Sequence, residues 1–335
     1  MVQAVKDLVA LGWYWVLGAS GGVPPGRIPI LTYHSVGLQG DPFFPSLSFC
    51  LFERQVRYLS RHFRFFSFGN FLERIRNGDP LPSRSAILTF DDGYKDNFRL
   101  VFPVLRKYAV PATIFLTTGS IGTEIPLWFD RLSSSIKNTS RTSLEWESGQ
   151  SIIVLSLVSL SDRLLALSRI KEDLKTLSNV ERLLKLDILE NTLGFSRYED
   201  LKDRMLNWDD IRTMDKEGIE MGGHTVSHPI LRNLTSDESH AEIGTCIASI
   251  ENHLQKKVRS FAYPNGTERD FNSETIDILK SYGVLGACTT IEGMASSWSQ
   301  PYAVPRIYAT DRNFYRFFWR ITHLPVPEEN SPLSP

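Results

Sequence analysis

The sequence has few of the features that mark several protein classes. Its 335 residues include only three cysteines, Cys50, Cys246 and Cys288, with no Cys-x-x-Cys spacing among them. Their number and spacing exclude a disulfide framework and a cysteine metal site. We expect the three cysteines to be small buried side chains of a protein in a reducing compartment. The formal net charge of −1 gives no electrostatic reason to expect nucleic acid as a partner.

Long apolar runs are also lacking. The stretch from Leu8 to Ala19 is apolar but only about a dozen residues long, whereas a helix needs about 20 to span a bilayer. It is also a poor signal peptide, because Asp7 cancels Lys6 and aromatic residues interrupt it. We therefore expect residues 1–27 to be an apolar segment and linker of a cytoplasmic protein.

Aromatic residues gather near both ends of the chain, at 13–15 and 314–320. Such stretches suit a membrane interface, so peripheral membrane contact is one interpretation. The alternative is that both stretches pack on the protein itself.

The remaining sequence alternates short apolar runs with stretches of helical spacing. Such strand–helix–strand units form parallel sheets and indicate the α/β class. Strands are expected at 28–34, 86–90, 110–116, 219–223, 258–264, 284–288 and 304–307. From about 128 to 205 the rhythm is interrupted by an expected hairpin around Ser148-Gly149 and by Leu-rich helices. We expect this stretch to be a mainly helical insertion without chemistry of its own.

Two adjacent carboxylates, Asp91 and Asp92, end the apolar run 86–90 and are followed by Gly93. Parallel α/β folds keep their chemistry at the carboxyl ends of strands. An isolated Asp-Asp-Gly is more commonly a turn with a solvated acid beside it. A functional interpretation therefore needs partners elsewhere in the chain.

His224 and His228 supply such partners. Two histidines four residues apart can face one metal ion, and one carboxylate completes a set of three ligands with a fourth position open for water. This is the arrangement of a catalytic metal site, although the histidine spacing alone is a weak signal. Neighbouring side chains point in different directions, so one of Asp91 and Asp92 would bind the metal and the other would act as general base.

The sequence Thr89-Phe90-Asp91-Asp92-Gly93, together with His224-Thr225-Val226-Ser227-His228-Pro229, resembles the polysaccharide deacetylase family. This family is also known as the NodB-homology family or carbohydrate esterase family 4. The resemblance implies a distorted, incomplete (β/α) barrel, which we place over residues 28–322. The Pro-rich end of the chain predicts a flexible tail at 323–335. It also implies Asp91 as catalytic base and Asp92, His224 and His228 as metal ligands.

The third motif of the family departs from its usual form. Ala262 stands where the family commonly has an arginine that orients the base, in Phe261-Ala262-Tyr263-Pro264-Asn265-Gly266. Arg306 is the candidate replacement, since a guanidinium can fix the orientation of a carboxylate; a surface arginine is the alternative. The resemblance also implies an oxyanion contact from the backbone N–H of Asn265 and a substrate contact from Tyr263.

The last motif of the family normally supplies a histidine as general acid. The segment Leu31-Thr32-Tyr33-His34 matches it best, which implies that this strand has been permuted to the N-terminus and that His34 is the acid. His323 is the second candidate, although it follows a helix and not a strand.

The resemblance implies one divalent metal ion, with zinc preferred and nickel, cobalt or iron compatible with similar ligands. The expected activity is hydrolysis of the N-acetyl group of an amino sugar in a polysaccharide, glycoconjugate or lipid-linked sugar. An O-acetyl esterase or another amidohydrolase on the same barrel is the first alternative. A non-catalytic sugar-binding relative is the second, motivated by the missing arginine.

Overall fold

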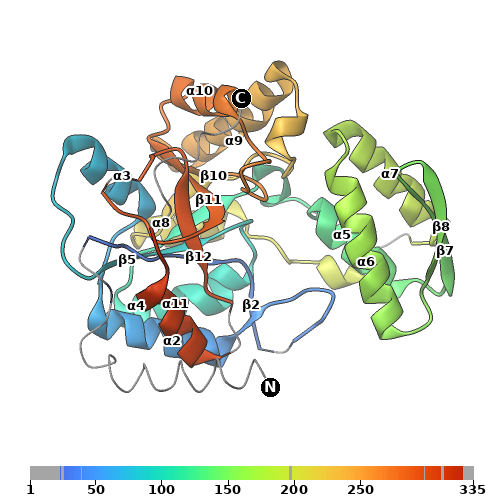
Figure 1. Cartoon of the computed structure of the whole chain (residues 1–335), viewed down its shortest axis with the longest axis horizontal. Coiled ribbons are helices and arrows are strands. Elements are labelled where there is room, and N and C mark those ends of the chain that lie inside the picture. The colour runs from blue at the N-terminus through green and yellow to red at the C-terminus, as the bar shows by residue number, and fades with distance from the viewer. Residues whose placement is uncertain are drawn as a thin grey trace.

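Seven parallel strands form a closed ring at the centre of the molecule (Figure 1). The computed structural model describes residues 23, 26–38, 40–195, 198–297, 299–310 and 313–326. The strands follow the order β1-β12-β11-β10-β9-β6-β5, and pairing of β1 with β5 closes the ring. Their bounds are β1 Ile30–Tyr33, β5 Ser85–Phe90, β6 Thr113–Leu116, β9 Glu220–Gly223, β10 Ser260–Ala262, β11 Gly286–Glu292 and β12 Val304–Tyr308. The predicted α/β barrel is confirmed, with seven strands in the ring.

Helices and short strands surround this ring. The helices are α2 (Phe49–His62), α3 (Phe68–Asn77), α4 (Phe102–Tyr108), α8 (Trp208–Lys216), α9 (Ser236–Leu254), α10 (Ser273–Ser281) and α11 (Phe314–His323). The short strands are β2 (Val36–Gly37), β3 (Leu47–Ser48) and β4 (Arg64–Phe65), of which β4 pairs with β5 outside the ring. Pro103 lies in the first turn of α4, where its missing N–H costs nothing, directly after a π-helical turn.

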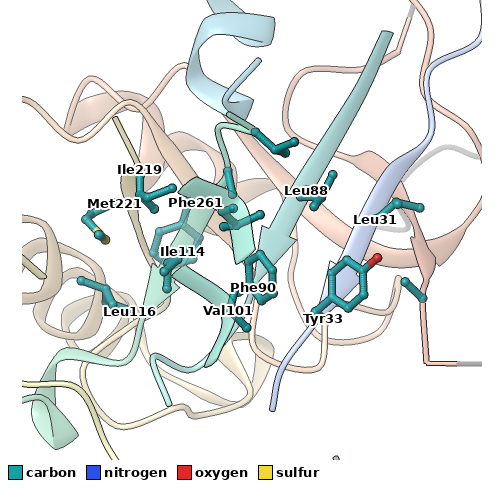
Figure 2. Close-up of a cluster of buried hydrophobic side chains, with 14 of the residues drawn as sticks. Leu31, Tyr33, Leu88, Phe90, Val101, Ile114, Leu116, Ile219, Met221 and Phe261 are labelled. Carbon is teal, nitrogen blue, oxygen red and sulfur yellow. The ribbon is translucent and has the colours of Figure 1, made fainter. Parts of the chain in front are cut away.

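The two-residue period of the strands sorts their side chains into two sets. On β5, Leu88 and Phe90 join the large cluster between the strands and the surrounding helices (Figure 2). Ile87 belongs to a separate cluster inside the ring, which α3 closes with Phe68 and Phe71. Because side chains alternate along the strand, Thr89 and Asp91 point toward the interior of the ring, as Ile87 does. On β12, Val304 lies in the same inner cluster, so the residue at 306 also points inward.

The insertion lies to one side of the barrel and has its own hydrophobic core (Figure 1). It contains α5 (Trp128–Asn138), the hairpin of β7 (Ser143–Ser148) and β8 (Ser151–Ser156), α6 (Leu160–Lys175) and α7 (Asn179–Thr192). Ser159 and Ser178 begin α6 and α7 with reciprocal capping boxes, which satisfy backbone donors at each helix start. Phe43 and Phe44, from the loop between β2 and β3, pack into this core and tie the insertion to the barrel.

Cys50 corrects the expectation that all three cysteines are buried. Cys246 and Cys288 are buried, but Cys50 is exposed. It lies in the first turn of α2, two residues before the buried Phe52, and this spacing puts it on the opposite side of the helix.

The two ends of the chain are described only in part. Residues 1–22 of the expected N-terminal segment and residues 327–335 of the expected tail lie outside the described residues. The aromatic stretch in α11 is described, and it buries Phe314, Phe317 and Phe318 in the main core. No helix in the described part of the chain is both long enough and apolar enough to cross a bilayer.

Candidate active site

The strand register brings the sequence-predicted residues to one rim of the barrel. Tyr33 of β1 pairs with Phe90 of β5, so His34 and Asp91 follow at neighbouring strand ends. Leu116 of β6 pairs with Gly223 of β9, and the loop that begins with His224 therefore leaves from the same rim. Because the strands are parallel, their carboxyl ends all meet there.

Asp91 is held by Arg306 of β12, a strand that is separated from β5 in the ring by β1 alone. Nη1 and Nη2 of Arg306 each donate to one carboxylate oxygen of Asp91 at 2.8 Å. Burial would raise the pKa of Asp91, but the positive charge of Arg306 outweighs it and lowers that pKa far below its usual value. Asp91 is therefore an ionised carboxylate in a fixed orientation.

Arg306 is itself fixed inside the barrel. Its side chain is 1% exposed, which rules out the surface arginine that was the alternative interpretation. Its Nε donates to the carbonyl of Thr289 at 2.8 Å, and its Nη1 also reaches the hydroxyl of Thr89 at 3.2 Å. A guanidinium with this many fixed acceptors presents a rigid fork to the carboxylate.

His34 lies beside the same carboxylate, with its Nε2 3.8 Å from Oδ2 of Asp91. The backbone carbonyl of His34 accepts a hydrogen bond from Asn97 at 2.9 Å, which holds the residue beyond the end of β1. Its side chain remains 38% exposed and lines the cleft above the site. Burial by surrounding protein atoms lowers the pKa of His34, and the nearby negative charge of Asp91 acts in the opposite direction.

Asp92, His224 and His228 form a second cluster on the same rim. Nε2 of each histidine lies 3.5 Å from Oδ1 of Asp92, and the three ligand atoms all lie within 4.8 Å of one another. Nδ1 of His224 donates to the carbonyl of Ala262 at 2.6 Å, which leaves its Nε2 to bind a ligand.

The polar atoms of this cluster fit a cation. Oδ1 of Asp92 is buried and has no hydrogen-bond partner among the described residues. Burial and the nearby charges of Asp91 and Asp130 raise the pKa of Asp92, and burial lowers the pKa of His224 to about 4. A divalent ion would favour the ionised carboxylate and the neutral imidazoles together. It would thereby offset the free-energy cost of burying the charge of Asp92.

The backbone of the cluster adopts conformations that side chains other than glycine seldom take. Asp92, Thr225 and His228 have φ values of 74°, 68° and 57°. Left-handed residues of this kind cost free energy and gather at functional sites, where surrounding contacts hold them in place. Asp92 therefore turns away from the direction of Asp91 immediately after β5, which separates two acids that are adjacent in the sequence.

Backbone and side-chain contacts hold the histidine loop. Glu242 of α9 accepts hydrogen bonds from the backbone N–H groups of Val226 and Ser227 at 2.8 and 2.9 Å. The N–H of Gly119 donates to the carbonyl of Val226 at 2.9 Å. A Cβ at position 119 would lie 2.6 Å from that oxygen, so only glycine permits this approach.

The insertion also contacts the histidine loop, which the sequence did not predict. Nε1 of Trp128 donates to the backbone carbonyl of His228 at 3.2 Å. The ring of Phe129 meets the ring of His228 edge to face, with centroids 5.1 Å apart. Asn179 of α7 donates to the hydroxyl of Ser227 at 3.1 Å. The sequence signal at this point is the Trp-Phe pair that begins the insertion, a stretch in which no chemistry was expected.

Of the remaining predicted residues, Asn265 and Tyr263 line the cleft and His323 does not. Asn265 lines it in a left-handed conformation, and its backbone N–H donates to no other residue of the described chain. Tyr263 also lines the cleft, but its side chain is 1% exposed, its hydroxyl donates to Tyr302, and its ring stacks on Phe271. The Tyr263 hydroxyl is therefore already occupied. His323, the second candidate for the acid, lies on α11 and does not line the cleft.

Comparisons with solved structures agree on the fold. The Streptococcus pyogenes deacetylase PplD in complex with acetate has a TM-score of 0.60 at 18% identity, covering 90% of this chain and 100% of that one. IcaB from Ammonifex degensii has a TM-score of 0.59 at 20% identity, covering 90% and 99%. At these identities the likeness concerns the barrel fold alone.

Sequence comparisons identify the family. The Bacillus subtilis protein YxkH is 22% identical over 284 residues, which are 84% of this chain and 71% of that protein. The poly-beta-1,6-N-acetyl-D-glucosamine N-deacetylase of Staphylococcus aureus (strain MSSA476) is 35% identical over 104 residues, which are 30% of this chain and only 35% of that enzyme. The family model described as polysaccharide deacetylase matches residues 78–287. The chain therefore belongs to the polysaccharide deacetylase family, whose members are hydrolases of amide bonds.

Proposed function

We propose that this protein is a metal-dependent N-deacetylase that hydrolyses the N-acetyl group of an amino sugar in a polysaccharide or a lipid-linked glycan. The observation that carries the proposal is the meeting of an oriented carboxylate, Asp91, with the Asp92–His224–His228 cluster at one rim. The name of the Staphylococcus aureus relative supports N-acetylglucosamine polymers as the class of substrate.

Asp92, His224 and His228 would hold the metal ion. Two imidazoles and one carboxylate, with space left for a further ligand, favour zinc, although nickel, cobalt and iron accept similar donors. When bound, the ion polarises the acyl oxygen and lowers the pKa of a water molecule, which are the properties that amide hydrolysis needs.

The side chains around this cluster would handle the protons. Asp91 accepts the proton of the attacking water, and Arg306 keeps this base ionised and oriented. The backbone N–H of Asn265 donates to the acyl oxygen as negative charge develops on it. His34 donates a proton to the sugar nitrogen as the C–N bond breaks, so the products are acetate and a free amino sugar.

Acetate release tests the proposal directly. Purified protein would be assayed with N-acetylglucosamine oligosaccharides, a lipid-linked N-acetyl sugar and O-acetylated sugars, with added zinc, nickel, cobalt or iron. We expect acetate from the N-acetylated substrates only, and its loss when a chelator removes the metal. Acetate from the O-acetylated sugars alone would make the protein an esterase. Absence of both bound metal and acetate release would make it a sugar-binding relative.

The Asp91→Asn variant tests the role of the base. Asparagine keeps the shape of the side chain but cannot accept the proton, so kcat should fall by roughly 10²–10⁴-fold while the metal stays bound. Asp277→Asn, which changes an exposed acid on α10, is the matched control. Full activity in Asp91→Asn would overturn the assignment of the base.

A further inference from the structure

The cleft above the site is larger than one acetylated sugar requires. Its volume is about 1050 Å³, at the upper end of the usual range for small-molecule sites. The barrel supplies one side, including the loop that follows β1 and the start of α2. The insertion supplies another, including Trp128 and Phe129 from α5 and Lys171 from α6. The chemistry therefore lies at the base of a space with room for neighbouring parts of a substrate.

The acids that line this cleft already have partners. Asp91 is paired with Arg306, and Asp130 is paired with Nε of Arg204 at 2.9 Å. Asp92 belongs to the proposed metal cluster, where one carboxylate would meet a divalent cation. The two pairs with arginine are each neutral, and a divalent ion bound at Asp92 would leave one positive charge in excess in this part of the cleft.

Two further cations line the cleft without an acid to pair with. Lys171 on α6 and Arg54 on α2 form no ion pair or hydrogen bond with any residue of the described chain, and each contacts an aromatic ring. The guanidinium of Arg54 lies over the ring of Phe314 at 4.2 Å. Nζ of Lys171 lies 5.2 Å from the ring centre of Phe129. Unpaired cations of both kinds attract anions, and they attract them more strongly where water is partly excluded.

Lys171 is the cation nearer to the chemistry. The Phe129 ring contacts both its ammonium and the ring of His228, one of the proposed metal ligands. Its charge also acts on Asp92 and on His34. Burial lowers the pKa of Lys171, because its half-buried ammonium has lost part of its water. A bound metal would neutralise Asp92, so Lys171 would then remain as surplus charge beside the acetylated sugar.

We propose that Lys171 forms a subsite for an anionic group, a phosphate or a carboxylate, carried by the sugar chain next to the acetylated residue. The proposal rests on the proposed deacetylase function and names the class of substrate for it. Lysine suits this role as a compact charge on a flexible stem, which can meet either anion without a fixed geometry. Deacetylation leaves an ammonium group on the sugar, and the charge of Lys171 would repel that group on a neighbouring sugar. Deacetylation of two consecutive sugars in one neutral chain is therefore disfavoured.

The test compares substrates that differ only in this group. The holoenzyme is assayed with a neutral N-acetylglucosamine tetrasaccharide, the same chain with a phosphate at its reducing end, and a chain with a glucuronate next to the acetylated sugar. We expect kcat/KM to be about tenfold higher for one or both anionic chains than for the neutral chain, because one hydrogen bond between charged groups contributes about that factor. The chain that shows the preference identifies the source of the anion.

Substitutions then locate the preference. Lys171→Gln should lower the ratio of anionic to neutral kcat/KM about tenfold, and Lys171→Arg should retain most of it. Lys175→Gln is the matched control, because Lys175 lies one turn along α6 and pairs with Glu172 outside the cleft. A purely structural role of Lys171 would lower kcat/KM for all substrates and leave the ratio unchanged.

Two results would overturn the subsite. One is equal kcat/KM for neutral and anionic chains, and the other is loss of the preference in Arg54→Gln but not in Lys171→Gln. If no substrate is hydrolysed, the proposed function fails, and calorimetry with N-acetylglucosamine 1-phosphate then decides the subsite separately. Binding that weakens about tenfold in Lys171→Gln would support it, and binding equal in both proteins would refute it.

Discussion

The barrel and the insertion bury their apolar side chains differently. The barrel strands are buried on both sides, one facing the ring interior and the other facing the helices. In the insertion, only the sides that face its own core are buried. Eight of the thirteen large apolar residues that are exposed in the described chain lie between residues 152 and 188. Burial therefore restricts the choice of residues at more positions of the barrel strands than of the insertion.

The same contrast extends to the site. The barrel supplies the proposed base, its arginine and the metal cluster, each fixed by strand register or buried hydrogen bonds. The insertion supplies the contacts that hold His228 from outside, through Trp128 and Phe129, and a charged wall of the cleft. Substitutions in the barrel should therefore alter the chemical step, whereas those in the insertion should alter metal affinity and substrate preference.

Among the substitutions that compare the barrel with the insertion, Arg306→Met should have the largest effect on turnover. Without the guanidinium, its positive charge no longer offsets the effect of burial on Asp91, so the pKa of Asp91 should rise. Because the base works in its ionised form, the acidic limb of the pH profile of kcat/KM should move to higher pH. Removing one partner of a buried pair should also lower the free energy of unfolding by about 3–5 kcal/mol. The measurements are the pH profile and denaturant unfolding.

Two further variants control for this substitution. Arg306→Lys keeps the charge but loses the two parallel hydrogen bonds, so it should move the acidic limb less. The double variant Asp91→Asn/Arg306→Met removes the buried charge as well and should recover part of the lost stability. An acidic limb at the same pH in native protein and Arg306→Met would show that Arg306 does not control the ionisation of Asp91.

Trp128→Phe should have an intermediate effect, on metal affinity. It removes the donor to the carbonyl of His228 while keeping an aromatic ring in the insertion core. Loss of such a supporting contact typically weakens metal binding about 10–100-fold. Competition with a chelator of known affinity measures the change, and stability is followed by thermal unfolding.

Trp146→Phe is the matched control within the same insertion. Nε1 of Trp146 donates to Asp173 at 2.9 Å, so one indole hydrogen bond is again lost, but without contact to the histidine loop. Metal affinity should be unchanged in this variant. An equal loss of affinity in both variants would show that the insertion acts only through its overall stability.

The sequence could predict the parts of the molecule that follow from local patterns. The alternation of strands and helices predicted a parallel α/β fold, and the resemblance of the two motifs to a known family implied the barrel. The two-residue period along β5 and β12 explains why Asp91 and Arg306 point into the same interior. The spacing of His224 and His228 predicted that both could meet one ion, and the structure brings them together.

Contacts made across the fold could not be predicted in this way. Trp128 and Lys171 belong to an insertion in which no chemistry was expected, and their position depends on how it packs on the barrel. Tyr263 follows the motif, but tertiary contacts to Tyr302 and Phe271 decide that its hydroxyl and ring are occupied. No local pattern records such distant partners.

The smallest effect on turnover is expected from two leucines of α7. Leu186 is fully buried, so Leu186→Ala should lower the free energy of unfolding by about 2–5 kcal/mol through lost burial and a cavity. Leu184 is 57% exposed on the opposite side, so Leu184→Ala should change it by less than about 0.5 kcal/mol. Denaturant unfolding measures both, and kcat at saturating metal should stay near the native value. A large loss of stability in Leu184→Ala would mean that the exposed side of the insertion is covered in solution.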